Sequence, residues 1–258
     1  MFCMKNMSLL ISALAFTSVA SAQDFSATEK RGLQMYLHDH ASAVVSDAVQ
    51  PMLTADMRKH MNGYITEERG GAIVVSFVGT GDDGHRYAWF RAAVGPDGQL
   101  MGNVSRYDQP QKLSDYEEKA AAALRTATAS KFAPCTPNYN TVVLPKEDGW
   151  QVYLLPGVKE KGMIPLGGAY RVDTDASGLT LLAQRGFTKT CVNLPVPDNA
   201  AALTITHLLD PDPTETHVFW QLWSRKPFFV VTVPNRSVWS IDKGHITFVQ
   251  KLKDNAAK

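Results

Sequence analysis

The sequence lacks an excess of charge of one sign, a long apolar run and a catalytic motif. Its 26 lysines and arginines face 25 aspartates and glutamates. This balance argues against nucleic acid as the main partner, because phosphate binding needs a basic excess. The apolar run at residues 9–16 is too short for a membrane span, and no later stretch is long enough. No GxSxG motif marks a nucleophilic serine. What remains, 45% hydrophobic and 20% charged residues, is an ordinary globular composition.

Residues 1–22 have the pattern of a secretory signal peptide. Lys5 is their one charged residue, the apolar run follows it, and small residues end the segment at positions 20–22. We therefore expect cleavage before Gln23 and a periplasmic or secreted protein; the alternative is an uncleaved anchor. Cys3 lies too far upstream to be a lipoprotein cysteine. The chain after residue 22 keeps 25 basic and 25 acidic residues, so it carries no polybasic membrane signal.

Two cysteines, Cys135 and Cys191, remain after the predicted cleavage. An even number in an oxidising compartment predicts one disulfide, which would close a long loop and contribute about 4 kcal/mol in the chain-entropy model. The alternative is a pair of free thiols used in catalysis or metal binding. Neither cysteine lies in a CxxC motif or beside a histidine suited to that role, so we favour the disulfide.

The first part of the chain predicts a helix followed by strands. Apolar residues recur at spacings of three and four from Leu33 to Ala48, and Ser26 with Glu29 fits a capping box at the start of the helix. A second short helix follows, and then the period changes to that of strands, which Pro110 is expected to end. The short helix is predicted over 55–62 and the strands over 72–78, 85–94 and 99–107.

The second part repeats this pattern. A helix over 114–131 starts with another capping box, Ser114 with Glu117, and its alanines predict close approach to a sheet. Antiparallel strands are predicted after it over 141–144, 150–155, 168–172 and 179–184. The order of helix, strands and acidic-glycine turns thus occurs over 26–107 and again over 114–187, as in a tandem repeat.

The fold class that these patterns predict is α+β. We expect two helix-plus-antiparallel-sheet units, at 23–112 and 113–258, the second extended by a C-terminal β-meander. Residues 228–231 are unbroken apolar, which predicts a central strand buried on both faces. The predicted strands of the meander are 203–208, 217–223, 227–233, 237–241 and 245–249.

The segment YRVDTDASGLTLLAQ, together with the helix before it, resembles PepSY-type domains of exported bacterial proteins. Tyr170, Val172, Asp175, Gly178 and Leu182 carry the resemblance. It covers about 115–187, and more loosely 26–107. The resemblance implies a small binding or inhibitory module without catalytic residues, and a tandem of such units is similar to exported inhibitor or immunity proteins. The chain departs from the family pattern in the loop at 156–167, the cysteine pair and the C-terminal meander.

A polar cluster at residues 207–217 is the strongest candidate for a metal site. His207, Asp210, Asp212, Glu215 and His217 have the ligand types of zinc or calcium. Two intervening prolines forbid a helical HExxH site, and the glycine of a calcium loop is missing, so we favour a connecting loop. We therefore expect no metal and no cofactor. On the first helix, His38 and His40 point to different faces, and we expect the polar groups around them to be solvated.

The predicted partner contact is an aromatic stretch near the end of the chain. Phe219, Trp220 and Trp223 lie on one predicted strand, followed by Arg225 and Lys226. One face of that strand is core; the other exposes an aromatic side chain unless it too is covered. Tryptophan and arginine are enriched at binding hot spots, which makes this stretch the candidate binding site.

These observations favour a non-catalytic exported binding protein, of the inhibitor or immunity type, that acts on another protein. Two alternatives stay open. One is an exported hydrolase with dispersed acidic or histidine residues, which leave little local sequence trace. The other is a carrier of a small ligand or metal centred on residues 207–217.

Overall fold

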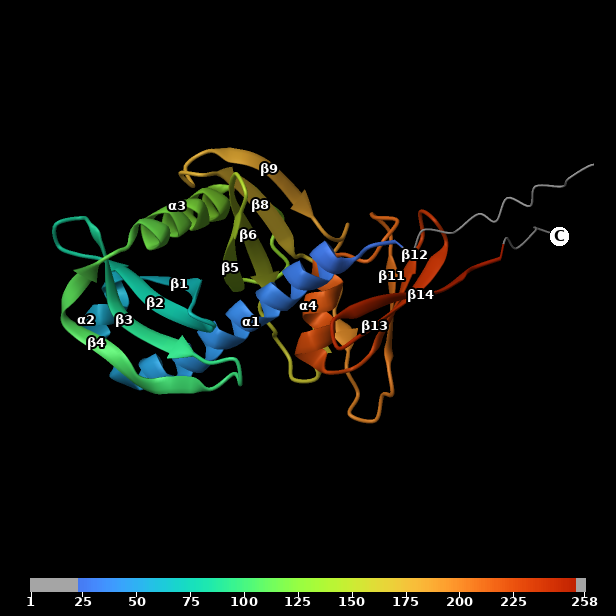
Figure 1. Ribbon diagram of the computed structural model, residues 1–258, viewed down its shortest axis with the longest axis horizontal. Coiled ribbons are helices and arrows are strands. Elements are labelled where there is room, and N and C mark those ends of the chain that lie inside the picture. The colour runs from blue at the N-terminus through green and yellow to red at the C-terminus, as the bar shows by residue number, and fades with distance from the viewer. Residues whose placement is uncertain (1–22, 254–258) are drawn as a thin grey trace, which may run out of the picture.

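The computed structural model describes residues 23–253, and the predicted signal peptide lies outside the described residues. In this range the fold is α+β, which confirms the predicted class (Figure 1). Its helices pack on three four-stranded sheets. No helix within residues 23–253 has both the length and the apolar character needed to cross a membrane.

The first sheet is an antiparallel meander in the order β1-β2-β3-β4. One of its faces packs against the long helix that precedes it in the sequence. The elements of this part are α1 (Ser26–Val49), the 3-10 turn η1 (Gln50–Met52), α2 (Ala55–His60), β1 (Met61–Arg69), β2 (Ala72–Thr80), β3 (Arg86–Val94) and β4 (Leu100–Lys112).

Three local predictions for this part are wrong. The short helix α2 ends at His60, because the chain from residue 61 pairs with β2 instead. Pro110 lies within β4, an edge strand on which a missing N–H disrupts no further ladder. Ser26 caps nothing with its side chain, because it is the first residue of α1 and Phe25 occupies the N-cap position. The carboxylate of Glu29 accepts a hydrogen bond from the backbone N–H of Ile246 at 2.7 Å instead of closing a capping box.

The second sheet is antiparallel, in the order β5-β6-β8-β9, and α3 covers one of its faces. Ser114 caps α3 with the predicted capping box. The elements are α3 (Asp115–Ala129), β5 (Tyr139–Lys146), β6 (Gly149–Pro156), β8 (Tyr170–Asp175) and β9 (Leu181–Gly186), and the connecting loops form a small ribbon from β7 (Met163–Ile164) and β10 (Leu194–Pro195).

The third sheet, in the order β11-β12-β13-β14, corrects the predicted meander. Residues 217–223 form part of helix α4 and are not a strand. The reason is topological: β11 and β12 are parallel, and parallel neighbours need a crossover, which α4 supplies. The elements are β11 (Leu203–His207), α4 (Glu215–Ser224), β12 (Phe228–Thr232), β13 (Ser237–Asp242) and β14 (His245–Lys251).

Strand β12 lies inside the third sheet, as predicted, but only one of its faces is buried. Phe228 and Val230 are buried, whereas Phe229 between them is 37% exposed. The covered face belongs to a core that the third sheet shares with α1, α4 and the second sheet. The other face carries the exposed Phe229, so the prediction that β12 is buried on both faces is wrong.

Helix α1 ties the three sheets together. It has 24 residues and is therefore about 36 Å long. Its C-terminal half packs on the first sheet through residues such as Val45, and its N-terminal half joins the shared core through Met35. Gly32 lets α1 touch α4, because a Cβ there would lie 2.4 Å from the Cβ of Val218. Helix α3 lies between the first and second sheets (Figure 1).

Candidate functional site

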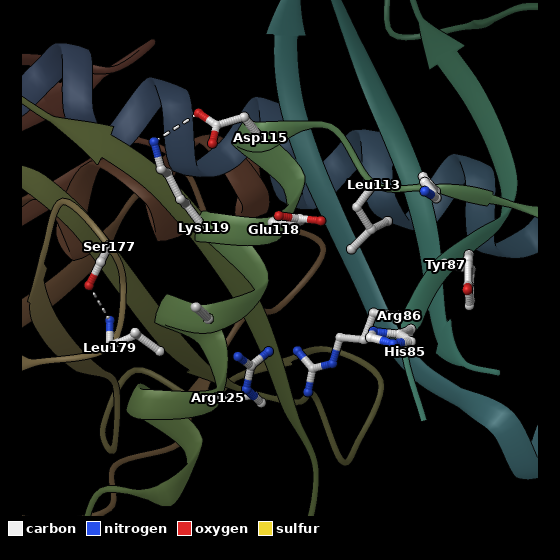
Figure 2. Close-up of a pocket in the computed structure, with 12 residues that line it drawn as sticks. His85, Arg86, Tyr87, Leu113, Asp115, Glu118, Lys119, Arg125, Ser177 and Leu179 are labelled. Carbon is white, nitrogen blue, oxygen red and sulfur yellow. Dashed lines mark hydrogen bonds and ion pairs between the residues drawn. The ribbon is translucent and has the colours of Figure 1, made fainter. Parts of the chain in front are cut away.

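Two hollows open beside α3, where it lies between the first and second sheets. The outer hollow, of about 610 Å³, is bounded by the start of β3, the end of β4, α3 and the β8–β9 turn (Figure 2). The inner hollow, of about 430 Å³, is bounded by β1, β5 and another stripe of α3. Arg86 and Arg125 line both hollows, so they stand where the two meet.

The N-terminus of α3 is held against the first sheet by a buried carboxylate. Glu117 accepts hydrogen bonds from Arg91 Nη2 at 2.7 Å, from the Ser76 hydroxyl and from the Ser114 backbone N–H. Burial alone would raise the pKa of Glu117, but these donors hold it below its usual value. The capping glutamate therefore also fixes α3 to β2 and β3, and with it the floor of both hollows.

Arg86 and Arg125 meet at one backbone carbonyl. Arg86 Nη1 donates to the carbonyl oxygen of Ala121 at 3.4 Å, and Arg125 Nη1 donates to the same oxygen at 3.2 Å. The two guanidinium groups lie side by side in Figure 2. Neither makes an ion pair with any side chain in residues 23–253, whereas Arg91 does. Two like charges at this range attract an anion that can pair with both.

The outer hollow carries side chains of both signs. Lys119 pairs with Asp115 at 2.8 Å along one face of α3 (Figure 2). Lys112 and Glu118 also line the hollow. The exposure of the Lys119–Asp115 pair limits its contribution to stability to a few tenths of a kcal/mol. Because Asp115 and Glu118 line the outer hollow, their carboxylates weaken its attraction for an anion.

The inner hollow is neutral apart from the arginine pair. Its lining combines apolar side chains, such as Leu124, with the amides and hydroxyls of Asn62, Asn140 and Thr128. Among the described residues that line it there is no aspartate or glutamate. Apolar walls with a few polar groups and one charged anchor are typical of ligand sites.

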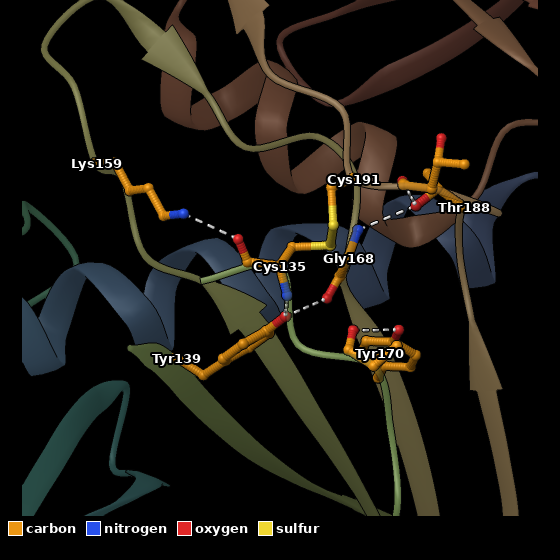
Figure 3. The surroundings of a disulfide bond; sticks show 9 residues. Cys135, Tyr139, Lys159, Gly168, Tyr170, Thr188 and Cys191 are labelled. Atoms are coloured by element: carbon orange, nitrogen blue, oxygen red, sulfur yellow. Dashed lines mark hydrogen bonds between the residues drawn. A yellow bond between two sulfur atoms is a disulfide. The ribbon is translucent and has the colours of Figure 1, made fainter. Parts of the chain in front are cut away.

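The predicted disulfide between Cys135 and Cys191 is confirmed (Figure 3). It supports one wall of the inner hollow through Tyr139. The Tyr139 hydroxyl accepts a hydrogen bond from the Cys135 backbone N–H at 2.9 Å and donates to the Gly168 carbonyl at 3.1 Å. Gly168 has a φ of +91°, and a Cβ there would lie 2.4 Å from Cys135 Sγ, so only glycine fits. Tyr139 in turn lines the hollow.

A buried polar cluster lies behind the inner hollow and overturns the expectation of solvated groups on α1. His38 and Asp39 are only 3% and 7% exposed, because this turn of α1 passes between the first and second sheets. His38 Nδ1 contacts Thr66 Oγ1 at 2.7 Å, and Asp39 accepts from Asn140 Nδ2 at 3.1 Å. Burial lowers the pKa of His38 to about 4 and raises that of Asp39 to about 6.

The first half of the predicted metal cluster is engaged in contacts with other protein groups. Asp210 accepts hydrogen bonds from Arg185 at 2.7 Å and contacts Nε2 of the buried His207 at 2.8 Å. Asp212 instead accepts from the Gln23 side chain at 2.7 Å. Within residues 23–253, no three histidine, cysteine, aspartate or glutamate side chains are grouped so that they could hold one metal ion.

The second half of that cluster also has protein partners. Glu215 pairs with Arg171 at 2.9 Å and accepts from the Tyr153 hydroxyl at 3.1 Å. His217 Nδ1 accepts from the Thr214 backbone N–H at 3.0 Å, and burial, with the charge of His207, lowers the pKa of His217 to about 3. Residues 207–217 therefore fasten β11 and α4 to the second sheet.

The predicted aromatic contact is rearranged by its helical conformation. Phe219 and Trp220 lie in the core at 1% and 2% exposure, whereas Trp223 keeps 39%. Arg225, which follows α4 in the left-handed conformation, is exposed, and Lys226 donates to the Asp198 carbonyl at 2.8 Å. Trp223 and Arg225 thus remain available at the surface, and their role in binding a partner stays a prediction.

Arg86 and Arg125 carry no local sequence signal of a functional site. Arg86 follows an acidic turn at the start of β3, and Arg125 lies in the middle of α3. Nothing in the local sequence relates the two, because their meeting depends on how α3 lies on the first sheet. The signal for them is the absence of nearby acidic partners once the fold is known.

Comparison with known proteins gives little further information. No model of a known family matches the chain, and no curated protein does. Among solved structures, the chain is similar to the C-terminal domain of YpeB from Bacillus megaterium, with 13% identity and a TM-score of 0.20. The match covers 58% of this chain and 64% of that one. The PepSY resemblance stays a prediction.

Proposed function

We propose that the protein is a non-catalytic binding protein that acts in the periplasm or outside the cell and holds another protein through the inner hollow. The observation that carries this is the arginine pair. Arg86 and Arg125 share one carbonyl and have no carboxylate partner in the described chain. They stand at the end of a hollow that is otherwise neutral. An anionic group of the partner would relieve their repulsion and form charge-assisted hydrogen bonds.

One further observation supports binding over catalysis, and another supports the compartment. Among the histidine and carboxyl groups, the largest pKa shifts belong to His38, Asp39 and His217. All three side chains are buried and contact other protein groups. Such shifts also arise at structural sites, and here each has a structural partner. The Cys135–Cys191 disulfide suits an oxidising compartment. An inhibitor or immunity-type role fits a scaffold of this kind.

The experiment is site-specific photo-crosslinking in the organism that makes the protein. A photoreactive residue replaces Thr128, which is exposed and lines the inner hollow. We expect one crosslinked protein partner, and we expect the product to disappear when Arg86→Gln and Arg125→Gln are added. The control position is Thr247, which is exposed on β14 and lies away from both hollows.

The proposal is wrong if Thr128 and Thr247 give the same products, or if the product at Thr128 survives loss of both arginines. It is also wrong if the purified chain turns over a peptide, ester or glycan substrate and one substitution abolishes turnover without unfolding the protein. That last result would restore the hydrolase alternative.

A further inference from the structure

The inner hollow is walled by the edges of two strands. Residues 62–65 of β1 and residues 139–141 of β5 line it consecutively. Side chains of a strand alternate between two faces, so consecutive residues can line one hollow only if the strand presents its edge there. In the described sheets, β1 and β5 are both end strands, each paired on one side. Tyr64 of β1 already contacts the Thr141 backbone of β5. Apart from that contact, such end strands can offer backbone N–H and C=O groups on their unpaired sides to an extended peptide.

The floor of the hollow is a single stripe of α3. Ala121, Leu124, Arg125 and Thr128 line it at spacings of three and four residues, which places them on one face of the helix. This stripe supplies apolar contact for the side chains of a bound strand, while the amides of Asn62 and Asn140 can take part in its hydrogen bonding.

Charge is concentrated at one end of the hollow. Arg86 and Arg125 line both hollows and therefore mark the boundary between them, and they carry the two charges among the described residues that line the inner one. A carboxylate has two oxygens and pairs well with two guanidinium groups. An anionic group that pairs with both arginines must therefore lie at one end of the molecule that fills the inner hollow, and not in the middle of that molecule.

We propose that the inner hollow binds the C-terminal end of an extended polypeptide, with its terminal carboxylate between Arg86 and Arg125. This rests on the proposed function and names the part of the partner that is held. A side-chain carboxylate of an extended strand points out of the line of the backbone, toward a face. A terminal carboxylate continues the line of the backbone. A peptide that lies along the strand edges would therefore bring its terminal carboxylate to the end of the hollow, where Arg86 and Arg125 stand.

The test compares two peptide pools on the immobilised protein. Both contain N-terminally biotinylated hexapeptides randomised at all positions; one pool ends in a free carboxylate and the other in a carboxamide. We expect peptides selected from the free-acid pool to bind. Their amidated forms should bind at least about tenfold more weakly, because a charge-assisted contact is lost. Amidation alters the peptide alone, so this comparison does not depend on the folding of a variant.

Protein variants supply the second arm of the test. Arg86→Gln and Arg125→Gln should each weaken binding of the free acid at least as much as amidation does. They should also make the free acid and the amide bind alike. Arg106→Gln is the matched control, because Arg106 is exposed on β4 and lines neither hollow. Unchanged thermal unfolding of each variant confirms that it is folded.

The outcomes separate the two proposals. Equal binding of acid and amide peptides, with both dependent on the arginines, overturns the terminal carboxylate but keeps the hollow as a binding site. The same holds if peptides with an internal aspartate or glutamate bind whether or not they are amidated. Binding that ignores both arginines removes the inner hollow from the proposed function as well. Failure of the free-acid pool to bind at millimolar concentration overturns the inference.

Discussion

Replacing Glu117 with alanine tests the mechanism that positions α3 and hence the candidate site. The side chain of Glu117 is 3% exposed and pairs with Arg91 at 2.7 Å. It also accepts hydrogen bonds from the Ser76 hydroxyl and, in the capping box, from the Ser114 backbone N–H. Glu117→Ala therefore removes a helix cap and an ion pair together, and leaves Arg91 without its carboxylate.

The magnitude follows from these contacts. Loss of the capping interaction costs about 1 kcal/mol. Breaking a fully buried ion pair costs roughly 3–5 kcal/mol. The Arg91 side chain keeps 23% exposure, so water recovers part of this cost, and we take about 2 kcal/mol for the ion pair. We therefore expect Glu117→Ala to lower the free energy of unfolding by about 3 kcal/mol.

The assay is equilibrium unfolding in urea, with an unchanged slope showing that the denatured state is the same. Glu118→Ala is the matched control: this exposed neighbour on α3 should change stability by less than about 0.5 kcal/mol. A double-mutant cycle with Arg91→Ala isolates the ion pair, and we expect coupling above about 1 kcal/mol. Coupling near zero, or equal effects of the two glutamate substitutions, would refute the reasoning.

Two further predictions concern the disulfide and pH. Cys135→Ser opens a loop of sequence separation 56 and should cost about 4 kcal/mol, which lowers the midpoint of thermal unfolding by roughly 10 °C; no change on reduction of the native protein would contradict this. His38 and His217 have folded pKa values of about 4 and about 3, below the ordinary 6.5, so each should contribute stability at neutral pH that is lost as pH falls below 6.5, at about 1.4 kcal/mol per pH unit. Asp39, with its pKa raised to about 6, should oppose this loss below pH 6, and unfolding curves of His38→Gln between pH 7 and 5 should show a shallower decline than the wild type.

Local sequence signals predicted a helix correctly where its end is marked by a capping motif. The capping box of Ser114 and Glu117 marked the start of α3, and the alanine stripe announced its close packing on a sheet. Local chemistry misled where another partner competed. Glu29 bonds to the backbone of β14 and not to its own helix end, and Pro110 is tolerated because β4 is an edge strand.

The aromatic stretch at 217–223 shows why some conformations could not be predicted. A short stretch that is mostly bulky and apolar, with only His217 and Gln221 polar, suits a buried strand and a buried helix equally, so periodicity does not separate them. The helical conformation is decided by the parallel pairing of β11 with β12, because parallel neighbours require a crossover element between them. That pairing brings together segments far apart in the chain, and no local pattern encodes it.

The amino-acid sequence by itself determined the α+β class, the pairing of the two remaining cysteines and the start of α3, since each depends on composition, parity or neighbours within one helical turn. Tertiary structure alone decided that α4 is a helix, that His38 and Asp39 are buried, and that Arg86 meets Arg125. These features arise where separate layers pack together, and the contacts between layers depend on the whole topology and not on any single segment.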